Sequence, residues 1–407
     1  MMQVIGLYAE LLSTDAYQDG FVPWNGRPAA AVTGVKPHGE NSVPPVPDEL
    51  LATCLYLVDV VGPQLADTVE ARHSHEENRA RMPVARIADV PRLRVLCEQA
   101  REKAEPLPRI AANQLARQAC HQDGPLHPLA WTHLVNLAGF GEIADTAKPH
   151  LRPALLVVAE EVGFAAPWAR NAPSIGRYGD NEPIPWTAPL APEDLRVAVG
   201  NVLTACIVVT SALSGMRASE LLELEAGCRK PARTVSGGGH RFRLSGKVVK
   251  NKRFGGVPDE WVDIEEVDRA IALAERLLGR PRGAALFGNV DLTVRVRTLR
   301  NWLERTGLRT HWGVPVIPNG PCGPRMLRRT LALSIAHRPG GLLAAKVALK
   351  HISVATTEGY AARPGGSQRL LHAEVETAEE EEHLKLTVQA FRDAQTGISP
   401  PAPEPAA

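Results

Sequence analysis

The chain has 407 residues and a mass of 43.9 kDa, so two or three domains are expected. Hydrophobic residues make up 44% and charged residues 22%, which is typical of folded globular proteins and not of disordered chains. No apolar run approaches the about 20 residues of a membrane helix, and the N-terminus lacks the features of a signal peptide. A soluble cytoplasmic protein is therefore expected. The six cysteines form no CxxC pair, which argues against a zinc ribbon or a disulfide scaffold.

The net charge is only +1, but the charges are unevenly distributed along the chain. Between Arg229 and Arg253 there is no acidic residue and there are nine basic ones, and residues 305–357 again contain no acid. The run Glu379–Glu382 reverses the sign. Blocks of this kind indicate one basic face that binds a polyanion, although a solvated surface would have the same composition.

The first half of the chain reads as helical. Residues 1–48 are rich in proline and glycine and predict an irregular arm. Asp48 is a candidate N-cap for a helix that is interrupted near Gly62–Pro63. Further helical segments are expected to begin near Pro91, Trp131 and His150. No strand is expected before residue 165.

Residues 166–191 combine proline, glycine and asparagine without a period, which predicts a linker or surface loop. A second unit begins at Pro192 with a helix that ends at Gly215. Short alternation in HRFRLSG and around WVDIEEV then predicts a small antiparallel sheet. Helices resume near Ile264 and at Asp291 and continue to about Phe391, and residues 391–407 are expected to be disordered. The fold class is therefore mainly α with a small antiparallel β-sheet (α+β).

Four segments of the second unit carry side chains suited to catalysis, in a distinctive order. The segment SGMRASELLEL presents Arg217 at the start of a helix, and the basic turn LSGKVVKNKRFGG follows it. In PRMLRRTLALSIA, Arg325 and Arg328 are three residues apart, which favours one helix face. In LKHISVATTEGY, His351 precedes Tyr360 by nine positions.

This order resembles the tyrosine recombinase (phage integrase) family. The family pattern T-G-M-R-x-S-E-L corresponds here to Ser214 to Leu221, and the nucleophile helix corresponds to His351 to Tyr360. The resemblance covers residues 192–390 and is much fainter before residue 190. It implies an integrase-like catalytic domain over 192–390 that acts on double-stranded DNA.

By this resemblance, the phenol oxygen of Tyr360 attacks a DNA phosphodiester and forms a 3′-phosphotyrosyl link. Arg217 and Arg328 would neutralise the charge that builds up on the non-bridging oxygens, because a guanidinium stays protonated and offers a planar fork of donors. His351 would donate to the same phosphate or handle the tyrosine proton. No cofactor and no metal are implied, since the guanidiniums supply the electrostatic stabilisation.

A lysine would protonate the leaving 5′ oxygen. By similarity it is Lys250, with Lys247 and Lys252 as close alternatives. One position departs from the family pattern, because Arg325 stands where histidine is usual. Arginine binds phosphate but is a poor proton acceptor at neutral pH, so a base for Tyr360 would have to be His351 or water.

Two other functions remain compatible with the sequence. A type IB topoisomerase-like enzyme would nick and reseal DNA without strand exchange, and a catalytically impaired DNA-binding protein would keep only the fold. For Arg217 itself, the alternative role is that of a partner for the C-terminus of the apolar helix that precedes it. Residues 49–165 correspond either to the DNA-clamping domain of the family or to a family-specific insertion. The resemblance also implies a synaptic tetramer on DNA in the cytoplasm, close to the nucleoid, with neither a membrane nor a small-molecule substrate involved.

Three smaller predictions concern single residues. Glu220, one turn beyond Arg217, is expected to pair with it and orient its guanidinium. Arg329 is expected on another helix face, in contact with DNA or solvent. The histidines of the first unit are expected on the polar surface and not in a metal site, because their spacing matches no ligand pattern; they are His73, His75, His121, His127 and His133, with Cys120 nearby.

Overall fold

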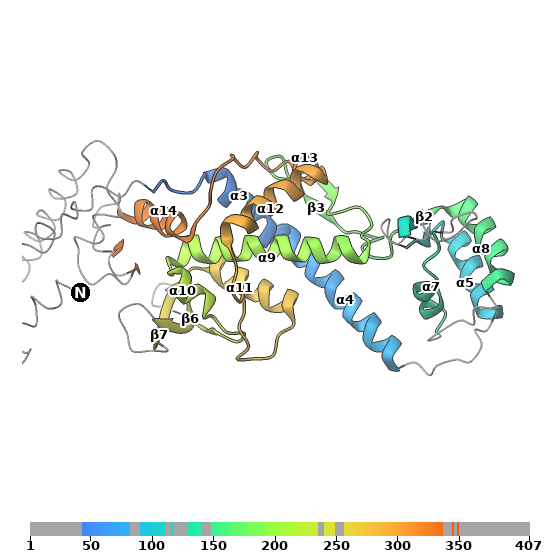
Figure 1. Cartoon of the computed structure of the whole chain (residues 1–407), viewed down its shortest axis with the longest axis horizontal. Coiled ribbons are helices and arrows are strands. Elements are labelled where there is room, and N and C mark those ends of the chain that lie inside the picture. Colours follow the sequence, from blue (N-terminus) through green and yellow to red (C-terminus); the bar gives the residue numbers. More distant parts are fainter. Residues whose placement is uncertain are drawn as a thin grey trace, which may run out of the picture. The chain divides into compact units, whose positions relative to one another are not determined.

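Figure 1 shows a computed structural model of the chain. It describes residues 43–81, 90–110, 115–117, 128–139, 148–234, 240–248, 256–336, 344–345 and 348–349. The chain divides into a compact unit Pro44–Leu331 and a second unit that combines Met1–Val43 with Ala332–Ala407. Most of the predicted arm, the predicted tail and almost all of the predicted helical stretch after Ala336 lie outside the described residues. The predicted domain boundaries stay predictions.

Helix α9 (Pro192–Ser214) is the centre of the larger unit. It begins with Pro192 at its first turn and ends at Gly215, whose φ of 66° lies in the left-handed region, and both ends agree with the sequence prediction. Fourteen of its residues are buried, including an unbroken run from Thr204 to Ala212, because α3, α11 and α12 pack around it (Figure 1). Cys206 is fully buried, as expected, and burial raises the pKa of its thiol.

The expectation that no segment is long and apolar enough for a membrane is wrong. Two described helices, Asp48–Asn78 and Pro192–Ser214, meet that criterion by length and composition. In the second helix, 78% of the apolar 18-residue stretch is buried inside the protein, as is typical of a core helix.

A long helical stretch with a π-helical interruption packs beside α9. It consists of α3 (Asp48–Tyr56), the π-helix η3 (Leu57–Val61) and α4 (Gly62–Arg81). The interruption predicted near Gly62–Pro63 is therefore confirmed. Its physical cause is Pro63, which has no N–H to donate to the carbonyl of Asp59, so the regular hydrogen-bond ladder cannot continue through this turn.

The two aspartates predicted at helix starts behave differently. Asp291 is the N-cap of α12, and its side chain accepts a hydrogen bond from the N–H of Val294 at 3.1 Å. Asp48 is not an N-cap: Pro47 occupies that position, and Asp48 is the first helical residue, where its negative charge complements the helix dipole.

Four more described helices begin in the larger unit, of which α11 and α12 contact α9 directly and α13 contacts α12. They are α11 (Glu265–Leu278), α12 (Leu292–Arg305), α13 (Leu308–Trp312) and α14 (Pro324–Ala336). Helix α11 contacts both α9 and α4. Ion pairs link it to the π-helical stretch, with Arg269 at 3.0 Å from Asp59 and Arg276 at 2.7 Å from Asp67. These pairs are exposed, so they fix orientation more than they add stability.

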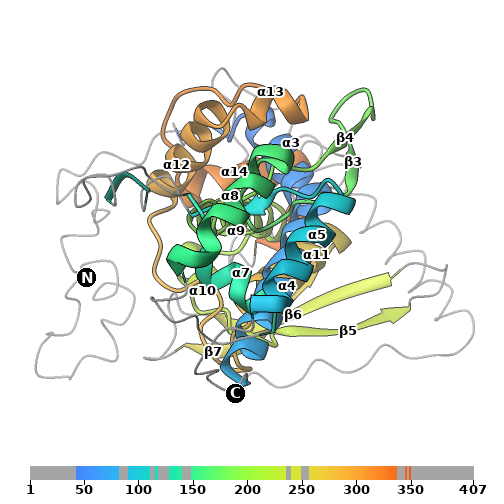
Figure 2. The same ribbon diagram turned by 90° about the vertical axis from the view of Figure 1, so that its right-hand side faces the viewer.

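A three-stranded antiparallel sheet confirms the predicted α+β class. Strands β5 (Arg229–Thr234), β6 (His240–Val248) and β7 (Val257–Asp263) lie in the order β5-β6-β7 (Figure 2). Leu244 and Trp261 pair across β6 and β7 and are both buried, so this face of the sheet packs on the core. Strand β5, sequence RKPART, has no apolar alternation, which is why the sequence did not predict it.

Three further helices pack around a separate hydrophobic cluster. They are α5 (Val90–Glu102), α7 (Trp131–Leu137) and α8 (Lys148–Val162), and the cluster includes Leu93, Leu134 and Leu155. The expectation of no strand before residue 165 is wrong, because β1 (Leu107–Pro108) and β2 (Phe164–Ala165) form a short parallel pair. Strands of two residues are too short to show alternation.

Residues 166–191 carry more structure than their composition indicates. Strands β3 (Ser174–Gly176) and β4 (Pro183–Pro185) form an antiparallel hairpin. The Tyr56 hydroxyl donates to the Gly176 carbonyl at 2.8 Å, and the Trp312 indole donates to the Trp186 carbonyl at 2.9 Å. These contacts between distant segments hold the hairpin against the helices.

Candidate active site

The turn between α9 and α10 (Ala218–Leu222) is the local structure on which the candidate site is built. Gly215 adopts the left-handed conformation that ends α9, and Met216 is fully buried beneath the turn. The chain then leaves the turn in an extended conformation at Arg217, with φ −73° and ψ 156°, which makes Arg217 the N-cap of α10. The prediction that a turn presents Arg217 at the start of a helix is confirmed.

Glu220 holds Arg217 at this position, as the sequence predicted. One carboxylate oxygen accepts from the backbone N–H of Arg217 at 2.8 Å, and the other accepts from its Nη1 at 2.7 Å. The Glu220 side chain is only 1% exposed, whereas that of Arg217 is 24% exposed. A buried carboxylate thus orients a guanidinium whose outer side remains open to solvent.

Arg328 reaches the same turn from α14. Its Nη1 donates a hydrogen bond to the carbonyl of Gly215, across a sequence separation of 113 residues. Arg328 is only 4% exposed. A buried cation that bonds a carbonyl at the end of α9 also complements the negative end of the helix dipole. The structure therefore brings Arg217 and Arg328 to one three-residue turn.

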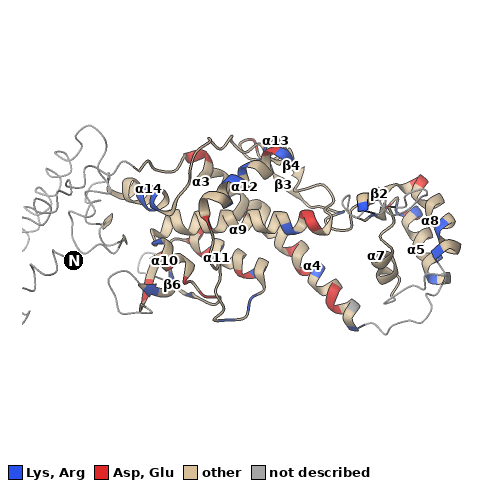
Figure 3. Cartoon of the chain, viewed as in Figure 1, with Lys and Arg blue, Asp and Glu red and all other residues tan. Residues whose placement is uncertain are grey.

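The other two arginines of α14 lie in different surroundings. Arg325, in the first turn of the helix, is exposed and forms no ion pair with a residue that the structure describes. Arg329 is 3% exposed, so the expectation that it faces solvent or DNA is wrong. The run Met326–Arg329 is buried throughout, because this end of α14 is enclosed on more than one side. Figure 3 marks the basic residues of the helix in blue.

The lysines are only partly described. Lys247 lies on β6 next to its end and forms an ion pair of 3.1 Å with Glu225. Lys250 and Lys252 fall in residues 249–255, and His351 and Tyr360 lie in the C-terminal part of the chain; all four are outside the described residues. Their assignment as site residues stays a prediction.

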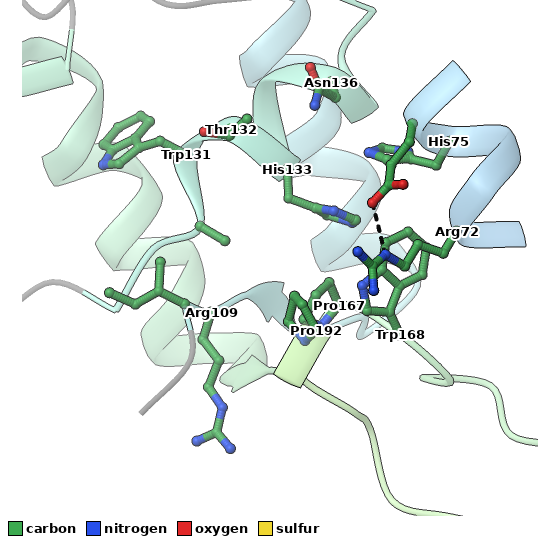
Figure 4. Close-up of a pocket in the computed structure, with 13 residues that line it drawn as sticks. Arg72, His75, Arg109, Trp131, Thr132, His133, Asn136, Pro167, Trp168 and Pro192 are labelled. Carbon is green, nitrogen blue, oxygen red and sulfur yellow. Dashed lines mark hydrogen bonds and ion pairs between the residues drawn. The ribbon is translucent and has the colours of Figure 1, made fainter. Parts of the chain in front are cut away.

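A histidine cluster that the sequence did not predict lines a separate pocket (Figure 4). His75 of α4 and His133 of α7 stack at 4.8 Å between ring centroids, and Trp168 meets both rings edge-on at 5.6 and 5.4 Å. The pocket has a volume of about 340 Å³, and Arg72 and Arg109 lie on its two sides. Neither histidine is a plain surface residue, which corrects that expectation, and no sequence spacing signals a contact across more than fifty positions.

Burial, assisted by the neighbouring His75 and Arg170, lowers the pKa of His133 to about 4, so its ring is neutral at physiological pH. Cys120, His121 and His127 lie outside the described residues. Within the part of the chain that the structure describes, no three His, Cys, Asp or Glu side chains are grouped to hold a metal ion.

No known protein-family model matches the chain, and no curated protein sequence matches it. Among solved structures the chain is similar to XerA recombinase, with 17% identity over 57% of this chain and 76% of that chain and a TM-score of 0.28. It is also similar to XerH site-specific recombinase bound to difH substrate in post-cleavage and pre-cleavage complexes. For these two, the identity is 13%, the coverage is 81% of this chain and 97% and 98% of those chains, and the TM-scores are 0.29 and 0.28. Because these scores are below 0.5, we base the function on the residues of this chain.

Proposed function

We propose that the chain is a site-specific DNA recombinase or integrase that breaks and rejoins DNA through a 3′-phosphotyrosyl intermediate without a metal ion. The single observation that carries this proposal is that Arg328 donates to the carbonyl of Gly215, in the same short turn that presents Arg217. Two guanidiniums from segments far apart in the sequence suit a site for a phosphodiester, which gains negative charge in the transition state.

Each residue has a role in the proposed reaction. The Tyr360 oxygen attacks the phosphorus and releases its proton to His351 or to water. The bond to the 5′ oxygen breaks, and Lys250 supplies the proton that this oxygen takes up. Arg217, oriented by Glu220, neutralises a non-bridging oxygen. His351 either donates to the same phosphate or takes the Tyr360 proton, and the reverse reaction with a new 5′ hydroxyl rejoins the strands.

In this scheme Arg328 acts from below the turn, where its buried guanidinium reinforces the positive field around Arg217. Arg325 occupies the position where the family usually has histidine, and its exposed guanidinium is suited to binding a DNA phosphate but not to accepting a proton. The partner in this proposal is double-stranded DNA, with self-association into a synaptic tetramer in the cytoplasm close to the nucleoid.

The proposal is tested with a nicked, radiolabelled duplex that traps a covalent adduct. We expect wild type to form a protein–DNA adduct, Tyr360→Phe to form none, and Arg217→Ala to lose at least about a hundredfold in rate, as for loss of a donor to a developing anion. Tyr178→Phe is the matched control, because Tyr178 packs edge-on against Tyr56 away from the turn and the substitution should leave the adduct unchanged.

The rival functions give different results in the same assay. Binding without any adduct would identify a DNA-binding protein that lacks catalysis, which Arg325 favours. An adduct together with relaxation of supercoiled DNA by a monomer, and no strand exchange between two sites, would identify a type IB topoisomerase-like enzyme.

A further inference from the structure

The outward face of strands β5 and β6 carries directly opposed basic residues. The register places Lys230 opposite Arg243, and Arg233 opposite Arg241. Leu244 is buried and points to the core. Because side chains alternate along a strand, Arg241 and Arg243 of β6 point away from the core. We call the residues Lys230, Arg233, Arg241 and Arg243 the basic sheet face.

Two cations on or beside the basic sheet face are already neutralised. Arg243 forms an ion pair of 2.8 Å with Glu260 on β7. Arg229, which pairs with Leu244, binds Asp268 of α11 through two hydrogen bonds of 2.8 and 2.5 Å. By contrast, Lys230, Arg233 and Arg241 form no ion pair with any residue that the structure describes. The basic sheet face thus keeps three uncompensated charges.

This arrangement is unfavourable for the folded protein alone. Like charges directly opposite each other on two strands repel, and each such pair destabilises a sheet. Arg233 and Arg241 are both exposed, with only solvent to screen them. Cross-strand pairs of opposite charge would be more stable at the same positions. A bound polyanion removes the repulsion, so the register points to an anionic partner.

The basic sheet face continues into a polar hollow of about 300 Å³ at its Lys230 end. Lys230, Lys247 and Arg282 line the hollow, together with Glu223 and Glu225. Gly227 has a φ of +85°, and a Cβ there would approach the Cγ of Arg282 at 2.7 Å. Because residue 227 is glycine, the aliphatic part of the Arg282 side chain can lie directly against the backbone. This contact fixes the Arg282 guanidinium in the hollow, beside Lys230 and Lys247.

We propose that the basic sheet face and this hollow bind the phosphate backbone of duplex DNA. From Arg241 to Lys247, β6 extends for about 20 Å. A DNA strand carries one phosphate for about every 3.4 Å along its axis, so this length spans about six phosphates of one strand. The inference rests on the proposed function only in taking DNA as the partner, since the arginines concerned are not part of the cleavage chemistry.

The test measures binding of a fluorescent duplex by wild type and by the double variant Arg233→Gln/Arg241→Gln over a range of salt concentrations. We expect the double variant to bind about tenfold more weakly at moderate salt and to lower the slope of log affinity against log salt by about 2, for two lost phosphate contacts. The loss should be the same for all DNA sequences, because phosphate contacts carry no sequence information.

A second measurement separates binding from simple unfolding. We expect Arg233→Glu, which places opposite charges across the strands, to raise the melting temperature of the free protein by about 1 to 2 °C while it weakens DNA binding. Arg229→Gln is the matched control on the same strand. It should lower the melting temperature, because it breaks the pair with Asp268, and leave the salt slope unchanged.

An unchanged salt slope in the double variant overturns the inference, and so does a lower melting temperature for Arg233→Glu. An acidic peptide of residues 372–384 is tested in parallel; tight binding of the peptide with an unchanged slope for DNA would identify an acidic protein segment as the partner instead. The outcomes are independent of the adduct assay, since a protein that forms no adduct can still show the predicted slope, and one that forms an adduct can fail to show it.

Discussion

At the scale of single residues, the position of Arg217 depends on the buried carboxylate of Glu220. The Glu220 carboxylate accepts two hydrogen bonds from Arg217, one from its backbone N–H and one from its guanidinium. The backbone contact fixes where α10 begins, and the side-chain contact fixes the direction of the charge. One buried residue therefore determines both the local fold and the candidate site.

Substitution of Glu220 tests this dual role. We expect Glu220→Gln to lower the free energy of unfolding by about 1 to 3 kcal/mol, since it weakens hydrogen bonds of a buried charged group. We also expect the rate of adduct formation to fall, because Arg217 loses its orientation. Urea denaturation and the adduct assay measure the two effects. Glu223→Gln, an exposed neighbour, should change neither; a variant of Glu220 as stable and as active as wild type would contradict the assignment.

At the scale of elements, the π-helical segment shows how one position can control packing. Gly62 lies where the helix returns from the π to the α conformation, and it faces α11. A Cβ at this position would overlap the Cδ2 of Leu273 and would lie 2.8 Å from the carbonyl oxygen of Leu57. Glycine is thus required here by the close approach of two helices, although glycine is unfavourable within helices in general.

Two alanine substitutions separate these opposing effects. We expect Gly62→Ala to destabilise the protein by about 1 to 3 kcal/mol, as for overpacking of a core. Gly200→Ala in α9 should instead stabilise it by about 0.5 to 1 kcal/mol, because the nearest atom to a new Cβ is 4.0 Å away and alanine favours a helix. Chemical denaturation measures both. Equal changes in the two variants would show that propensity, and not the contact with Leu273, decides the outcome.

At the scale of the whole larger unit, the cluster of His75, His133 and Trp168 joins helix α4 to α7 and to the segment that follows β2. The low pKa of His133 has a consequence for stability. A histidine with a pKa near 6.5 in the unfolded chain and about 4 in the folded one takes up a proton more readily when unfolded. Its contribution is complete above about pH 6.5 and is lost as the pH falls towards 4.

We therefore expect the free energy of unfolding to decline between pH 7 and pH 4.5. His133 should contribute about 1 to 2 kcal/mol of this decline, a value already lowered to allow for the partial exposure of its side chain. In His133→Gln this part of the decline should disappear. His73→Gln, which changes an exposed histidine on α4, should keep the wild-type profile. Parallel profiles for wild type and His133→Gln would exclude the predicted role.

The structural features predicted correctly from the sequence are those that depend on residues close together in the chain. The start of α9 at Pro192, its end at Gly215 and the helix start at Asp291 are local signals, and the structure confirms all three. The strand alternation of β6 and the α+β class follow from periodicity in the same way. Arg217 was also found from a local pattern, the turn into a short helix.

Features that depend on contacts between residues far apart in the sequence were either not predicted or predicted incorrectly. The burial of Arg329 results from the way α14 is enclosed, and the stacking of His75 on His133 joins positions with no sequence relation. Strand β5 has no apolar pattern of its own and exists because β6 pairs with it. Arg217 and Arg328 belong to one motif order in the sequence, but only the fold shows that Arg328 bonds Gly215 in the turn that presents Arg217.

The enclosure of α9 also affects how the chain must be made. Helix α3 leaves the ribosome before α9, but α11 and α12, which cover other sides of it, follow. Translation from Ser214 to Arg305 takes about 5 to 20 seconds at known ribosomal rates. For that time α3 is the only one of these three helices that can cover the apolar 23-residue helix α9, so we expect biosynthesis of this protein to depend on chaperones that shield such segments.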